Sequence, residues 1–168
     1  HNPEFTCMEI YVAYKDYNWM MDFVEKMLAK VCTAVNGTTK VKIGENEVDF
    51  AAGYRRLPIL EAIREYAGVD VSGMNEDELR ATCKQLNVDV DPSMGKGKLI
   101  DAIFGEYCED KLIQPTFIID YPVEMSPLTK RHRNNPELTE RFELFVCGKE
   151  LANAYSELND PIDQLERF

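Results

Sequence analysis

Two short segments, one near each end of the chain, carry a carboxylate and an aromatic ring two residues apart. The first contains Glu9 and Tyr11, and the second contains Asn153, Tyr155 and Glu157. Residues two apart share one face of a β-strand, so each segment would present its polar groups to one side. A carboxylate beside aromatic rings suits a pocket for an ammonium group. Solvent-facing ladders of side chains give the same pattern, and the spacing leaves both interpretations open.

A pair of carboxylates lies just before the second segment. Glu143 and Glu150 fall on adjoining predicted strands, and Gly148 between them permits a tight turn. Mg²⁺ is commonly bound by one or two carboxylates together with substrate phosphates, and this arrangement would supply such a pair. Two unrelated surface acids are the alternative interpretation. In a regular strand, the side chains of Glu150 and Asn153 would point to opposite faces. A β-bulge within residues 149–152 would let both point to the same face.

Other residues with reactive side chains do not form recognisable sites. The run Gly95–Lys98 lacks the spacing of a phosphate-binding loop and follows no predicted strand, which favours a turn that enters a helix. His1 and His132 have no neighbours that indicate acid–base chemistry, and no residue resembles an activated nucleophile. The five cysteines are scattered, which argues against a zinc site or a disulfide framework and fits a reducing cytoplasm.

The composition indicates globular material, with 45% hydrophobic residues among 168. A net charge of −11 argues against sequence-independent binding to the phosphate backbone of nucleic acids, so DNA is not expected as a partner. No apolar run approaches the ~20 residues that span a bilayer, so no membrane association is expected. The chain begins with His1 instead of Met and ends at Phe168 within a predicted helix, which indicates an internal fragment.

The periodicity of apolar residues predicts the order of elements. Residues 5–14 alternate as a strand, Asn18 caps a helix that ends at Asn36-Gly37, and residues 39–50 form a hairpin. A helix that starts at Pro58, and another that follows a cap formed by Asn75 with Glu78 three residues on, indicate a compact helical insertion. Strands return at residues 116–121, 141–147 and 151–158, with a long polar loop at 122–139 and a final helix after Asp160.

The predicted fold class is α+β with an antiparallel sheet, flanking helices and a small helical insertion. The later strands follow one another too closely for crossover helices, which requires antiparallel pairing. The predicted division gives residues 1–55 to the first part of the core, 56–110 to the helical insertion and 111–168 to the second part of the core.

Several segments resemble the class II lysyl-tRNA synthetases. Residues 1–14, HNPEFTCMEIYVAY, are similar to the second half of motif 2 in that family. Residues 126–130, SPLTK, and 138–145, LTERFELF, resemble the loop and strand that precede its motif 3. Residues 148–161, GKELANAYSELNDP, resemble its amino-acid-binding strand. The match runs in order over nearly the whole chain, from within motif 2 to before motif 3, and is looser through the insertion.

The resemblance implies a role for each candidate residue. Phe5 would stack on the adenine of ATP, and His1 would approach its phosphates. Glu143 and Glu150 would hold Mg²⁺ on the triphosphate. The lysine pocket would be lined by residues of both segments: Glu9, Tyr11, Asn153, Tyr155 and Glu157.

The implied activity is a two-step ligation. The carboxylate of lysine attacks the α-phosphate of ATP, and the resulting lysyl-adenylate passes its lysyl group to a ribose hydroxyl of tRNA(Lys). The parent protein is expected to be a cytoplasmic homodimer. The arginines of motifs 2 and 3 would fall outside the chain, so the isolated fragment is expected to be inactive. The alternative is a fragment or paralogue of the synthetase core that binds lysine or nucleotide without catalysis.

Overall fold

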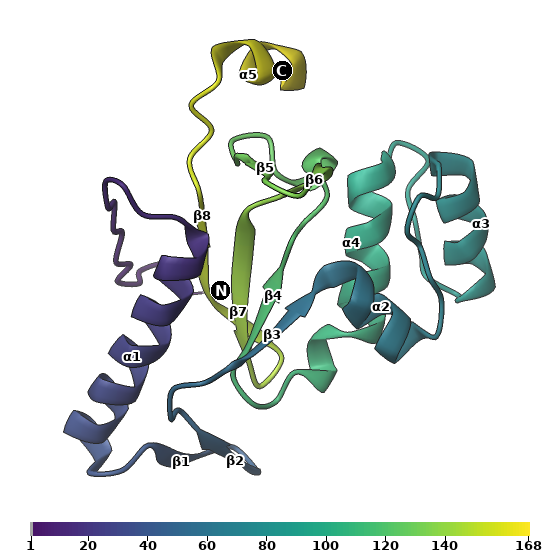
Figure 1. Ribbon diagram of the computed structural model, residues 1–168. Coiled ribbons are helices and arrows are strands. Elements are labelled where there is room, and N and C mark those ends of the chain that lie inside the picture. The colour runs from purple at the N-terminus through teal and green to yellow at the C-terminus, as the bar shows by residue number, and fades with distance from the viewer. Residues whose placement is uncertain (1) are drawn as a thin grey trace.

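A four-stranded sheet runs through the middle of the protein. The computed structural model describes residues 2–168, and Figure 1 shows the sheet between one long helix on one side and a group of shorter helices on the other. Its order is β3 (Arg55–Pro58), β4 (Thr116–Ile119), β7 (Arg141–Val146) and β8 (Lys149–Tyr155). Neighbours among β4, β7 and β8 are antiparallel, which confirms the predicted α+β class. The edge strand β3 pairs with β4 in parallel, because the helices between them form a crossover connection.

The long helix α1 (Tyr17–Asn36) covers one face of the sheet. Its N-terminus is capped by Asp16, whose carboxylate accepts a hydrogen bond from the Trp19 amide at 3.0 Å, so the cap lies two residues before the predicted Asn18. The helix ends where Gly37 adopts a φ of 73°, and its amide donates to the Thr33 carbonyl. A left-handed residue closes the last turn at low steric cost when it is glycine, which explains why this end was predictable.

The core beneath α1 is built from alternate residues of the central strands. Phe117 and Phe142 are fully buried and meet edge-on, with ring centroids 5.0 Å apart. Met21 of α1 is also fully buried in this cluster. We call this side of the sheet the α1 face, and its strand residues include Phe117, Phe142, Leu144 and Val146.

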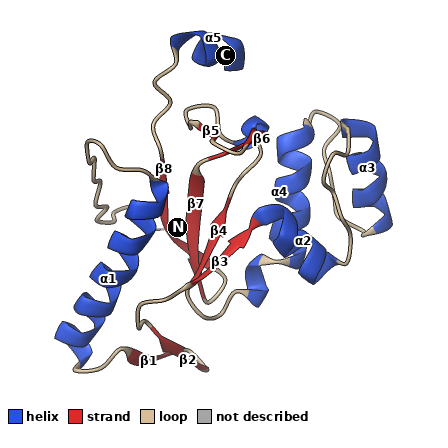
Figure 2. Ribbon diagram, in the orientation of Figure 1, coloured by secondary structure: helices blue, strands red, loops and turns tan. Residues whose placement is uncertain are grey.

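The opposite face packs against the helical insertion, α2 (Ile59–Ala67), α3 (Glu76–Gln85) and α4 (Lys96–Tyr107). Figure 2 shows these helices on the side of the sheet away from α1. Asn75 and Glu78 form the predicted capping box, with both hydrogen bonds at 2.9 Å. Ile118 and Phe145 carry the sheet side of this core, and we call it the insertion face.

Helix α4 of the insertion comes close to the second half of the chain at Gly97. A Cβ atom at this position would lie 2.9 Å from the backbone oxygen of Glu124, in the 3₁₀ turn η2 (Val123–Met125). The Lys96 ammonium lies 3.6 Å from the Glu124 carboxylate across the same contact. Glycine allows this approach, because the two atoms that a Cβ would meet first belong to the backbone of Glu124 and cannot rotate away.

Alanine is therefore expected to have opposite effects at the two glycines inside α4. Gly97→Ala should lower the free energy of unfolding by about 1–3 kcal/mol, since helix and turn must separate. Gly105→Ala should raise it by about 0.5–1 kcal/mol, since alanine favours the helix and its Cβ would meet nothing closer than 3.9 Å. Urea denaturation monitored by Trp19 fluorescence would measure both. A Gly97→Ala protein as stable as Gly105→Ala would contradict the close contact.

Two small hairpins and a short helix complete the fold. The hairpin β1 (Lys40–Ile43) and β2 (Asn46–Asp49) forms as predicted. The predicted loop 122–139 instead contains η2 and the hairpin β5 (Arg131–His132) and β6 (Asn135–Thr139). The helix α5 (Pro161–Arg167) is capped by Asp160 and is joined to β5 through Asp163, whose pKa is held at about 2 by the guanidinium groups of Arg167 and Arg131.

No helix in residues 2–168 is long and apolar enough to cross a membrane.

The predicted strand over residues 5–14 is wrong for this structure. Residues 4–12 have no regular secondary structure, and Tyr14 has a φ of 60°. Their large side chains are exposed, and the Tyr11 side chain retains 85% of its accessible surface. A strand is stabilised by a hydrogen-bonded neighbour and by a covered face. The described chain provides neither for this segment.

A candidate active site on the hairpin of β7 and β8

The two predicted metal ligands lie on one hairpin. Strands β7 and β8 are joined by a tight turn at Cys147-Gly148, where both residues have positive φ, and Glu143 pairs with Asn153. The register shifts once, so that Leu144 pairs with residue 152 and the next residue, 145, pairs with Glu150. This is the bulge predicted within 149–152. It restores the phase of the strand and places Glu143 and Glu150 on the same, insertion face of the sheet.

Glu143 is held by hydrogen bonds at both carboxylate oxygens. The Tyr121 hydroxyl donates to Oε2 at 2.9 Å, and Arg141 Nη2 donates to Oε1 at 2.5 Å. Burial raises the pKa of the Glu143 carboxyl, Arg141 and the Tyr121 bond lower it, and the charge of Glu150 raises it further. The effect of Glu150 indicates that the carboxylates of Glu143 and Glu150 are near enough to repel each other. A cation bound by both would reduce this repulsion.

Further acids line the same side of the sheet. Asp101 of α4 and Glu109 of the 3₁₀ turn η1 (Glu109–Lys111) both have raised pKa values, chiefly through desolvation, although the Asp101 side chain still reaches solvent. Their charges interact with each other and with those of the hairpin acids. No group of three or more acidic, histidine or cysteine side chains in residues 2–168 has the arrangement of a metal site. A pair of carboxylates alone fits a cation that keeps water and phosphate ligands, as Mg²⁺ does.

Arg141 and Tyr121 complete the site and were not identified from the sequence. The Arg141 guanidinium lies 4.7 Å from the centre of the Tyr121 ring and donates from Nε to Asn153 Oδ1 at 3.1 Å. Arg141 lies two residues before Glu143 on one strand, and this spacing was the available signal. Tyr121 follows β4 and reaches Glu143 only through the pairing of β4 with β7, which the local sequence does not encode.

The three lysine-pocket candidates from the second segment lie in or just after β8, the strand at the β7 edge of the four-stranded sheet. Asn153 and Tyr155 pair with Glu143 and Arg141, so they share the insertion face with the carboxylates. Glu157 lies past the strand end, is exposed, and forms an isolated bridge with Thr129.

The N-terminal candidates are not joined to this group. Phe5, Glu9 and Tyr11 are exposed, and no hydrogen bond or ion pair in residues 2–168 connects them to β8. His1 lies outside the described residues. The N-terminal segment therefore does not pair with the strand of Asn153 in this structure, because residues 4–12 form no strand.

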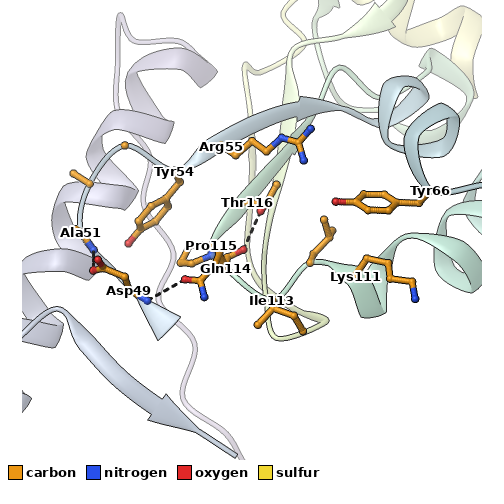
Figure 3. A pocket seen from close by; sticks show the side chains of 13 residues that line it. Asp49, Ala51, Tyr54, Arg55, Tyr66, Lys111, Ile113, Gln114, Pro115 and Thr116 are labelled. Carbon is orange, nitrogen blue, oxygen red and sulfur yellow. Dashed lines mark hydrogen bonds between the residues drawn. The ribbon is translucent and has the colours of Figure 1, made fainter. Parts of the chain in front are cut away.

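A separate hollow of about 520 Å³ lies where β3 and β4 begin. Figure 3 shows Tyr54 and Arg55 on one side of it and Tyr66 and Lys111 on the other. It is open to solvent and contains none of the predicted site residues. The polar groups of the hairpin, and not this hollow, are the candidate site.

Comparison with known proteins agrees with the resemblance drawn from the motifs. The family model of class II tRNA synthetases (D, K and N) matches residues 1–168. A lysine–tRNA ligase of Porphyromonas gingivalis is 71% identical over the whole chain, which covers 29% of that protein. Those of Christiangramia forsetii and Azobacteroides pseudotrichonymphae are 66% and 61% identical, also over the whole chain, which covers 30% and 34% of them. The chain, about a third of the length of these relatives, belongs to the class II tRNA synthetases.

Proposed function

We propose that the protein carrying this chain is a lysine–tRNA ligase, and that the chain supplies part of its active site. The observation that carries the proposal is an identity of 61–71% over the whole chain to proteins named lysine–tRNA ligase. The clustering of Glu143, Asn153 and Glu150 on one face of a hairpin supports it, since ATP and an amino acid both need fixed polar groups.

The reaction uses these residues for binding and orientation. The lysine carboxylate attacks the α-phosphate of ATP, pyrophosphate leaves, and a ribose hydroxyl of tRNA(Lys) then displaces AMP from the lysyl carbonyl. Glu143 and Glu150 would hold Mg²⁺, which when bound neutralises charge on the triphosphate. Phe5 would stack on adenine and His1 would approach the phosphates. We assign the lysine pocket to Glu9, Tyr11, Asn153, Tyr155 and Glu157.

The orientation of Asn153 refines its role in that pocket. Arginine has only donors, so the atom of Asn153 that faces Arg141 Nε must be the amide oxygen. The Nδ2 group is left to donate to a ligand oxygen, which leaves the two ammonium groups of lysine to the carboxylates of Glu9 and Glu157.

The remaining features of the parent protein follow from this proposal. We propose a homodimer that works in the cytoplasm, where tRNA is used. The boundaries at residues 55 and 110 are proposed as those of the helical insertion, and the packing of α2, α3 and α4 together on the insertion face supports them.

The test is ATP–pyrophosphate exchange by the full-length protein with single amino acids. Lysine should support exchange, and aspartate and asparagine, the other substrates that the family description names by letter, should not. Exchange with aspartate or asparagine would refute the assignment to lysine. Lysine binding without exchange would support the non-catalytic alternative.

A further inference from the structure

Arg141 makes polar contacts with four groups through one guanidinium. Nε donates to Asn153 Oδ1 at 3.1 Å, and Nη2 donates to Glu143 Oε1 at 2.5 Å. Nη1 donates to the Met125 carbonyl at 3.1 Å and to Ser126 Oγ at 3.0 Å. Its side chain is 16% exposed. All three guanidinium nitrogens are thus engaged, and the planar fork has one orientation that serves all four partners.

These contacts fix two groups that the proposed function uses for different ligands. Glu143 is a proposed metal ligand, and both its oxygens are held, one by Arg141 and the other by Tyr121. Asn153 is a proposed lysine ligand, and its amide cannot flip without placing its NH₂ group against Arg141 Nε. The orientation of the carboxylate and that of the amide are therefore set by the same side chain.

The guanidinium is itself held by the turn that the insertion contacts. Met125 ends η2, whose Glu124 meets α4 at Gly97 and Lys96. Tyr121 adds its ring beneath the guanidinium. Arg141 thus has a rigid support on the side away from the hairpin, as a group that positions others requires.

We propose that Arg141 is a positioning residue that orients Glu143 and Asn153 as one unit for the adenylation step. This inference rests on the proposed function. In this role Arg141 does not contact the substrate directly. Activity then requires the planar shape of the guanidinium in addition to its charge.

The experiment compares three variants of the full-length protein with the wild type in lysine-dependent ATP–pyrophosphate exchange, with lysine and ATP varied independently. Arg141→Met should lower kcat/KM for lysine by roughly 100-fold, from the loss of charge-assisted bonds to two ligand-binding groups. The KM values for lysine and for ATP should both rise, because Asn153 is assigned to lysine and Glu143 to the metal on ATP. Arg141→Lys keeps the charge without the fork, so it should lose roughly tenfold in kcat/KM.

Arg55→Met is the matched control. Arg55 of β3, in the same sheet as Arg141 but outside the site, makes a two-bond ion pair with Glu65 of α2, at 3.2 and 2.6 Å. It should exchange at the wild-type rate. Thermal melting of each variant reports folding, and Arg141→Lys keeps the test decisive if Arg141→Met does not fold.

The outcomes separate the two proposals. Wild-type rates in Arg141→Lys would overturn the positioning role, because a single ammonium cannot hold four partners in this geometry. A lower rate in Arg141→Met with unchanged KM values for lysine and ATP would also overturn it, since neither group that Arg141 orients would then have been disturbed. No exchange by wild type and Arg55→Met together would refute the proposed function, and this inference with it.

Discussion

Replacing Phe142 with alanine is expected to lower the free energy of unfolding by about 3–5 kcal/mol. Phe142 is fully buried on the α1 face, between the ring of Phe117 and the residues under α1. Phe117 in turn contacts the ring of Tyr54 at 5.7 Å, so the truncation removes one member of a chain of three aromatic rings. The cavity would lie inside the central sheet, where the surrounding strands cannot close it.

Urea denaturation of the 168-residue chain, followed through Trp19, its single tryptophan, would measure this effect. Leu151→Ala is the control, because Leu151 lies in the same sheet but is 52% exposed. Its effect should stay within about 0.5 kcal/mol. Equal losses for the two variants would mean that the α1 face is not the packed core described above.

Glu157→Gln in the full-length protein is expected to weaken the use of lysine by about 30-fold or more. Loss of one charged partner of a buried ion pair costs about 2–5 kcal/mol, and ~1.4 kcal/mol corresponds to a factor of ten. Glu157 is exposed here, and no hydrogen bond or ion pair within residues 2–168 uses its carboxylate, so the carboxylate can meet a ligand. The KM for ATP should change much less, since adenine is assigned to Phe5.

Steady-state exchange kinetics with lysine and ATP varied independently would separate these effects. Glu137→Gln, the same isosteric change at an exposed glutamate of β6, is the control and should leave both constants unchanged. An unchanged kcat/KM for lysine in Glu157→Gln would remove Glu157 from the pocket.

Features encoded by adjacent residues were predictable from the sequence. The capping box of Asn75 and Glu78, the helix end at Gly37 and the bulge near Glu150 each follow from a local pattern or a phase conflict. The bulge could be predicted because Glu150 and Asn153 can face the same side of the sheet only if the strand contains one extra residue.

Features that depend on distant partners were not predictable. The alternation in residues 5–14 is that of a strand, but alternation does not supply the neighbour that a strand must bond to. Arg141 has the spacing of a site residue, yet its role became visible only when the folded chain brought Tyr121, Ser126 and Asn153 around its guanidinium.

The parallel pairing of β3 with β4 has a consequence for the order in which the protein folds. The hairpin of β7 and β8 closes a turn of two residues, whereas β3 meets β4 only across the whole stretch 59–115. Closing a longer loop costs more chain entropy, and contacts distant in sequence form more slowly. The site hairpin and the helices of the insertion should therefore assemble early. The edge at β3 should be the last part of the sheet to form and the first to exchange its amide protons with solvent.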